Sequence, residues 1–308
     1  GQTDVYYGRS WLLTHMLYND PARAGQLPRY LDAINRGEDM KKAATDAFGD
    51  LAELDKELNR YMNKPMTFRT TAEPIAVPGK VSVTALPAAE DALLPLRLER
   101  ISAGSDDARL SAVRDELKAL SAVHGGDAGV WFELASAEWG FDDDKRDAAA
   151  ARAAVDKALA IDPKHVRANV LLGRIMTAEV EAKADPKAED WNAVRKPIAL
   201  ANRTNPDDPV PLAAYFRSFL DQGRAPPPIA IEGLGRAFLL APENIGVRVS
   251  YAFALANGGK YDDALKLAKA VAFDPHDGGQ GERLLAQLEK MRERSNGRAS
   301  AAETATDD

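Results

Sequence analysis

The sequence predicts an all-α protein: a solenoid of stacked helical hairpins, preceded by a small helical cluster and an extended linker. Over residues 88–288, apolar residues recur at steps of three and four, the spacing of one buried helix face. Prolines that close successive helical segments lie 43, 36 and 33 residues apart (206 − 163, 242 − 206 and 275 − 242). Because proline cannot continue a helical hydrogen-bond ladder, this spacing indicates helix pairs that repeat every 33 to 43 residues.

Residues 128–163 form the clearest repeat. Their two helices each predict one buried face, made by Trp131, Leu134 and Ala135 in the first helix and by Ala151, Val155 and Ala158 in the second. The alanines are small where two helix axes must approach closely, and we expect Trp131 to be deeply packed between the helices. The acidic insertion 141–147 (FDDDKRD) lacks the alternating ligands and the glycine of a calcium loop, so we interpret it as a solvated turn.

This repeat resembles the tetratricopeptide repeat (TPR). That family places a large apolar residue, a leucine and a small residue on the first helix, two alanines on the second helix and a proline after it. These places are filled here by Trp131, Leu134, Ala135, Ala151, Ala158 and Pro163. The resemblance covers most of residues 88–288 and implies about four to five helix pairs, with the first helices lining a concave groove.

Composition sets the organisation around this solenoid. Residues 1–63 predict a small helical cluster, and 64–87 carry four prolines, which predicts an extended linker or a short hairpin across Pro78-Gly79-Lys80. After Leu288 the chain turns polar, and we expect 289–308 to be a frayed helix and then a disordered tail.

The first 63 residues predict four helices, over residues 4–19, 26–36, 39–48 and 51–62. This stretch resembles the last helices of a bacterial metallopeptidase-like domain of the gluzincin type, which implies that the zinc motif lies upstream. Such a motif needs two histidines four residues apart on one helix face, and none of the four histidines here has that spacing. Two interpretations of His15 stay open: a residue close to the metal ligands of a longer protein, or a partly buried helix histidine.

The bulk composition limits the possible functions. The 308 residues are 45% hydrophobic and 28% charged, carry a net charge of −7, and include no cysteine. Thiol catalysis and zinc thiolate sites are therefore excluded, and without a long basic block neither nucleic acid nor an anionic membrane is an expected partner. No apolar run is long enough to span a membrane. We predict no cofactor, no metal and no enzymatic activity, and the peptidase resemblance implies the bacterial periplasm or envelope.

The predicted function is protein or peptide binding, as a scaffold or adaptor. The TPR resemblance implies that a groove is lined by Phe132, Trp139, Arg167, Arg174, Arg217 and Phe253. Arginine forks suit carboxylates, so we expect an extended peptide with acidic groups or a free C-terminus. Two alternatives stay open: the arginines pair with acidic residues of adjacent helices and bind nothing, or the chain is the C-terminal part of a zinc peptidase whose repeats steer the substrate.

Overall fold

The computed structural model describes residues 2–304 except 37, 67, 69, 71, 74–78, 80, 143 and 273–278, and it leaves out the side chains of 2–4, 35, 280 and 297–304. The described residues form helices joined by turns, with no strand among them. Two compact units are present: one up to Val81, and one comprising Ser82–Phe273 with Gly279–Asp308.

The first unit contains the four predicted helices and one additional short 3-10 helix. In chain order they are α1 (Gln2–Asn19), η1 (Pro21–Arg23), α2 (Gln26–Asn35), α3 (Met40–Phe48) and α4 (Leu51–Tyr61). The side chains of Asp39 and Asp50 cap α3 and α4 by accepting hydrogen bonds from backbone N–H groups of the first turn. These caps explain why two short helices begin at the residues where the sequence predicts them.

The core of this unit is small. Leu12 and Met16 of α1 are buried against Leu54 and Leu58 of α4. Tyr7 and Trp11 belong to the same predicted stripe of α1, but they remain 52% and 59% exposed. Helical spacing therefore identified the stripe, and the position of α4 decided which part of it is buried.

The described residues of the linker 64–87 form neither helix nor strand. The predicted hairpin across Pro78-Gly79-Lys80 lies mostly outside the described residues, since only Gly79 is placed there. Gly79 has a φ of 94°, a left-handed conformation that glycine adopts without strain.

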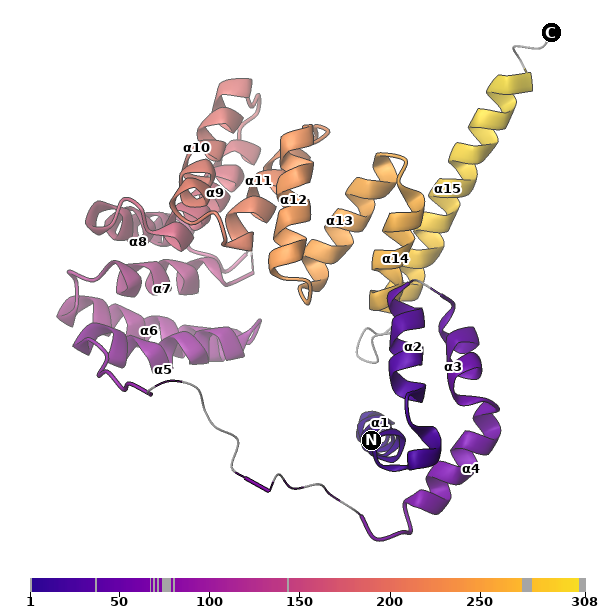
Figure 1. Cartoon of the computed structure of the whole chain (residues 1–308). Helices are drawn as coiled ribbons and strands as arrows, with labels where there is room; N and C mark the ends of the chain where they lie inside the picture. Colours follow the sequence, from indigo (N-terminus) through magenta and orange to yellow (C-terminus); the bar gives the residue numbers. More distant parts are fainter. Residues whose placement is uncertain are drawn as a thin grey trace. The chain divides into compact units, whose positions relative to one another are not determined.

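In the second unit, the described residues form five helix pairs and a final helix (Figure 1). The pairs are α5 (Ala88–Ala103) with α6 (Asp107–Val123), α7 (Ala128–Trp139) with α8 (Ala148–Ile161), α9 (Val166–Glu181) with α10 (Ala188–Thr204), α11 (Pro209–Asp221) with α12 (Pro228–Leu240), and α13 (Ile245–Asn257) with α14 (Tyr261–Ala272), and the last helix is α15 (Gln280–Thr304). Each helix packs on the next along the chain, so the pairs stack as a solenoid. The predicted fold class is therefore confirmed.

The pair α7–α8 packs as its sequence predicts. Ala135, Ala151, Val155 and Ala158 have no exposed surface, and Leu134 is 5% exposed. The proline after the pair, at 163, follows the last residue of α8 by two positions. Small side chains at the contact allow the two helix axes to approach closely, as expected.

Trp131 was expected deep inside this pair, and that expectation is wrong. The indole is only partly buried at the edge of the core, and its Nε1 donates to the carbonyl oxygen of Gly125 at 2.8 Å. The ammonium of Lys157 lies 4.0 Å from the ring centroid and covers one face. A polar indole nitrogen needs a partner, so the ring stays at the margin, where a turn carbonyl is available.

The acidic insertion is better anchored than a solvated turn. Its first residue, Phe141, is 4% exposed and packs with Ala103 and Leu110 of the preceding pair. Arg146 donates from Nε to the Trp139 carbonyl at 2.9 Å and from Nη2 to the Phe141 carbonyl at 3.0 Å. The described aspartates of the insertion are exposed as predicted, but one buried ring holds the loop on the solenoid.

The last helix is longer than expected. Leu284 and Leu288 are buried among residues of α13 and α14, and Met291, beyond the predicted end of the solenoid at residue 288, packs against the same cluster. The backbone of α15 then stays helical through Thr304, where a frayed and disordered tail was expected. A run rich in Glu, Lys, Arg and Ala has high helix propensity, so the loss of apolar residues did not end the helix.

Candidate functional site

The first helices of the first four pairs, α5, α7, α9 and α11, lie next to one another on one face of the solenoid. Helix α9 packs on both α7 and α11, whereas α11 and α13 are not among the helix pairs in close contact. Two hollows open along this face, and they share Arg174 and Val210 as lining residues. We call them the arginine hollow and the apolar hollow.

The arginine hollow has a volume of about 300 Å³ and lies over α5, α7 and α9. It is lined by Arg100, Phe132, Ser136, Trp139, Gly140, Arg167, Val170, Leu171, Arg174 and Val210. Three of these residues are arginines and none is acidic, in a protein whose net charge is −7. An anionic group is therefore the ligand that this lining favours electrostatically.

Two of the three arginines are held by carboxylates. Arg100 donates from Nε to Glu133 at 2.7 Å, and Glu133, which is 2% exposed, also accepts from Arg97 at 2.7 Å. Arg167 forms an ion pair through Nε with Asp208 at 3.1 Å. Both pairs use the Nε edge of the guanidinium, and the terminal amino groups of these two arginines bond to no described residue.

Arg174 differs from its two neighbours. Its side chain is exposed and makes no hydrogen bond or ion pair with any described residue. It lies two turns along α9 from Arg167, and it lines both hollows. It is therefore the cation on this face whose charge is least compensated from within the described chain.

Phe132 and Trp139, the aromatic residues that line the arginine hollow, each pack against a further side chain. The ring of Phe132 lies 5.0 Å from that of His165, and the guanidinium of Arg146 lies 4.3 Å from the Trp139 ring centroid. His165 caps α9, because its Nδ1 accepts from the backbone N–H of Ala168 at 3.1 Å. Burial lowers the pKa of this imidazole, outweighing the nearby carboxylates, led by Asp162, that raise it.

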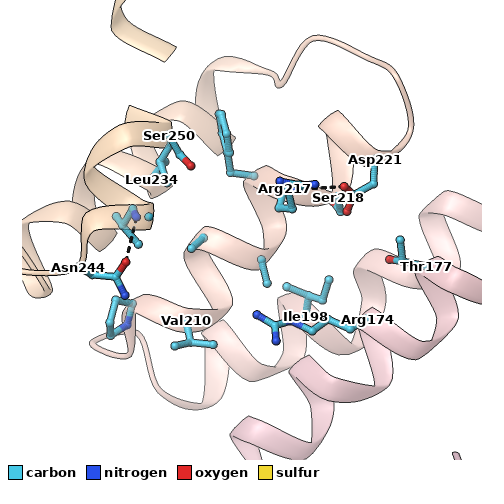
Figure 2. Close-up of a pocket in the computed structure, with 16 residues that line it drawn as sticks. Arg174, Thr177, Ile198, Val210, Arg217, Ser218, Asp221, Leu234, Asn244 and Ser250 are labelled. Atoms are coloured by element: carbon cyan, nitrogen blue, oxygen red, sulfur yellow. Dashed lines mark hydrogen bonds and ion pairs between the residues drawn. The ribbon is translucent and has the colours of Figure 1, made fainter. Parts of the chain in front are cut away.

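The apolar hollow has a volume of about 340 Å³ and lies among α9, α11 and α13. Buried side chains of Ile198, Phe216 and Leu234 line it, together with partly exposed Val210 and Ala213. Figure 2 shows a dashed contact between Arg217 and Asp221, which is an ion pair of 2.7 Å, and none at Arg174. The acidic side chain of this hollow is thus already paired within its own helix.

Five of the six residues predicted for the groove line these hollows. The arginine hollow contains Phe132, Trp139, Arg167 and Arg174, and the apolar hollow contains Arg174 and Arg217. Phe253 does not join them, because it packs against the core of α13, α14 and α15. Its position on a first helix agrees with the pattern used to predict the groove. However, α13 is not in close contact with α11, and the Phe253 ring packs into the C-terminal core.

The groove arginines differ in whether acidic residues of the chain already pair with them. Arg167 and Arg217 are paired with acidic residues, while Arg174 is unpaired among the described residues. Arg100 was missed altogether, because it lies in the weak first pair. The two glutamates of the mostly apolar helix α7, Glu133 and Glu138, were the available sign, because a carboxylate that is buried there needs a cation from a neighbouring helix.

In the first unit a hollow of about 240 Å³ at α2 and α3 has acidic and basic side chains together in its lining. His15 contacts Tyr61 through Nδ1 at 2.9 Å and stacks on Trp11, as a partly buried helix histidine does. Within the described residues there is no cluster of three or more His, Cys, Asp or Glu side chains that could hold a metal ion. None of the described helices is long and apolar enough to cross a bilayer.

Comparison with known proteins supports the fold. No protein-family model and no curated protein matches this sequence. A solved thermophilic TPR protein of Thermus thermophilus is 17% identical, and the match covers 66% of this chain and 98% of that one with a TM-score of 0.51. The structure of MamA is 12% identical over 70% of this chain and 99% of its own length, with a TM-score of 0.40.

The first of these likenesses is close enough to show the fold. The second unit is therefore a TPR-like helical solenoid, as its sequence predicts. At such low identity a shared fold does not carry a shared partner. Neither comparison shows the resemblance of residues 1–63 to a peptidase domain, which stays a prediction.

Proposed function

We propose that this protein is a scaffold that binds a protein or peptide through the first-helix face of its solenoid. The bound segment lies across the two hollows and presents acidic groups or a free C-terminus to the arginines. TPR-like solenoids expose an extended face of this kind, which supports binding to another chain rather than catalysis.

Arg174 is the observation that carries this proposal. An exposed guanidinium with no partner among the described residues, next to two others whose terminal amino groups are unbonded, provides several charge-assisted hydrogen bonds to a carboxylate. The surrounding Phe132, Trp139 and Val210 add apolar contact area at the same place.

The test is selection of peptides from a random library by the purified chain. We expect enrichment of acidic peptides by the wild-type protein, and loss of that enrichment in Arg174→Glu. Arg203→Glu is the matched control, because it makes the same change of charge at an exposed residue of α10, outside both hollows. Folding of each variant is checked by circular dichroism.

Two further results would decide the details. Selected peptides that bind equally with a free or an amidated C-terminus would assign recognition to acidic side chains, and loss on amidation would assign it to the terminus. An enriched set that Arg174→Glu leaves unchanged would place the binding surface elsewhere and refute the proposal.

A further inference from the structure

The two hollows differ in chemistry although they share a wall. The arginine hollow presents three cations and no acid, whereas the apolar hollow is lined by buried Ile198, Phe216 and Leu234, and its one acid is paired. Arg174 and Val210 belong to both, so a segment that fills one hollow meets the edge of the other. This inference rests on the proposed function and makes it more specific.

The arginines are held in place before a ligand arrives. Glu133 is buried and fixes Arg100 by its Nε edge, and Asp208 does the same for Arg167. Asp208 is itself fixed as the N-cap of α11, where it accepts from the backbone N–H of Val210 at 2.9 Å. Such pre-positioning lowers the side-chain entropy lost on binding and directs the terminal amino groups toward a bound carboxylate.

The apolar hollow suits a large aliphatic or aromatic side chain. Its volume of about 340 Å³ lies within the range of ligand-sized sites, and Ala213 leaves room above the buried side chains. Burying one such side chain there supplies affinity that the exposed arginines alone do not, because exposed ion pairs contribute little.

We propose that the partner carries a two-part motif: one acidic side chain for the arginine hollow and one large apolar side chain, two residues away, for the apolar hollow. In an extended segment, residues two apart point to the same face and lie about 7 Å from each other. Hollows that share a wall accept such a pair, whereas adjacent residues point to opposite faces.

Synthetic peptides test the spacing. The probes are short peptides, blocked at both ends, with one Glu and one Leu, or with the Glu or the Leu alone, on a background of alanine, serine and glycine. The Glu and Leu are adjacent, two apart or four apart, and fluorescence anisotropy measures binding. The two-apart peptide should bind about tenfold more tightly than the peptides with Glu or Leu alone. Equal affinity for all spacings overturns the motif.

Two variants separate the two hollows. Arg100→Gln should reduce the benefit of the Glu about tenfold and leave that of the Leu, since Glu133 keeps its bond to Arg97 and the fold is retained. Ala213→Leu fills the apolar hollow, so it should reduce the benefit of the Leu and leave that of the Glu. If both variants weaken all probes equally, the assignment of the Glu to the arginine hollow and of the Leu to the apolar hollow is wrong.

The outcomes distinguish this inference from the proposed function. Loss of binding in Arg174→Glu together with indifference to spacing refutes the motif and leaves the binding face intact. Binding that Arg174→Glu does not change refutes both. A folded Arg100→Lys variant guards against structural damage, because it keeps the positive charge beside Glu133 but loses the guanidinium fork.

Discussion

The pair α7–α8 and the junction of α10, α11 and α12 belong to the same solenoid but are built differently. Between α7 and α8, Ala135, Ala151, Ala154 and Ala158 are at most 4% exposed, and the core there is made of closely packed apolar side chains. Between α10 and α11 the buried side chains include an arginine, Arg195, which is 9% exposed, beside apolar Val194 and Ile198.

Arg195 has polar partners but no carboxylate. Its Nε donates to Ser218 Oγ at 3.0 Å, its Nη2 donates to Ser218 O at 3.1 Å and to Gln222, and its guanidinium lies 3.9 Å from the Phe219 ring centroid. Burial lowers the pKa of this guanidinium. The nearby hollow among α10, α11 and α12 has a volume of about 410 Å³, and Asn202 Oδ1 at its edge has no hydrogen-bond partner among the described residues.

The difference shows what the repeat pattern controls. Where the sequence matches the repeat, small residues permit close contact between the two helices of the pair, and the buried glutamates of α7 pair with cations of the preceding helices instead. Where the match weakens, the helices leave space that a long cation and a hollow occupy. The stability of the solenoid should therefore be concentrated at α7–α8, and four measurements test this.

The largest effect is expected at the tight pair. Leu134→Ala removes a side chain that is 5% exposed in the main core, and it should lower the free energy of unfolding by about 2–5 kcal/mol. Chemical denaturation measures the change. Leu239→Ala is the control, because Leu239 is 77% exposed on α12. Equal shifts of the two midpoints would show that α7–α8 is not the stable centre.

A smaller effect is expected at the polar junction. Arg195→Ala leaves the buried Ser218 oxygens without their donor and should cost about 1–3 kcal/mol. Arg195→Met keeps much of the packing on Phe219 and should cost less. If Arg195→Met were as damaging as Arg195→Ala, the hydrogen bonds rather than the packing would stabilise this junction.

One substitution should have opposite signs at two glycines. A Cβ on Gly173 of α9 would lie 2.5 Å from Ile198 Cγ1, so Gly173→Ala should destabilise the protein by about 1–2 kcal/mol. A Cβ on Gly233 of α12 would meet only Leu212 Cδ2, at 3.4 Å, so Gly233→Ala should stabilise it by about 0.5–1 kcal/mol. Thermal unfolding compares the two variants, and shifts of the same sign would contradict the difference in packing.

The smallest effect is expected from pH. The pKa of His165 in the folded protein lies below its value of about 6.5 in the unfolded chain, so the unfolded chain binds a proton first as pH falls. The contribution of His165 to stability is therefore complete above pH ~6.5 and is lost as pH falls toward the folded pKa.

His165→Asn isolates this contribution, because asparagine also caps a helix but does not titrate. The difference in unfolding free energy between wild type and variant should shift against the wild type as pH is lowered from about 7.5 to about 5.5. A difference that stays constant over this interval would mean that the neutral imidazole cap is not what stabilises the start of α9.

Local pattern accounts for most of the fold. Periodicity and closing prolines located the helix pairs of the second unit, and the alanines of α7 and α8 are buried as their spacing predicts. These features depend on residues within a few helical turns of one another, so the sequence alone expresses them. The apolar pattern did not locate the end of the last helix. Helix α15 continues beyond residue 288 because the residues there have high helix propensity although the apolar pattern has ended.

The candidate site depended on the tertiary structure. The TPR resemblance implied that Arg167, Arg174 and Arg217 lie on the first-helix face, but only the packing of α5 on α7 brought Arg100 to Glu133. Phe253 likewise packs into the core of α13, α14 and α15, and Arg174 is left without a partner among the described residues. The sequence by itself determined which residues share a helix face, since that follows from the helical period. Which of them meet across helices was decided by interhelical distances, because those depend on every side chain at the contact.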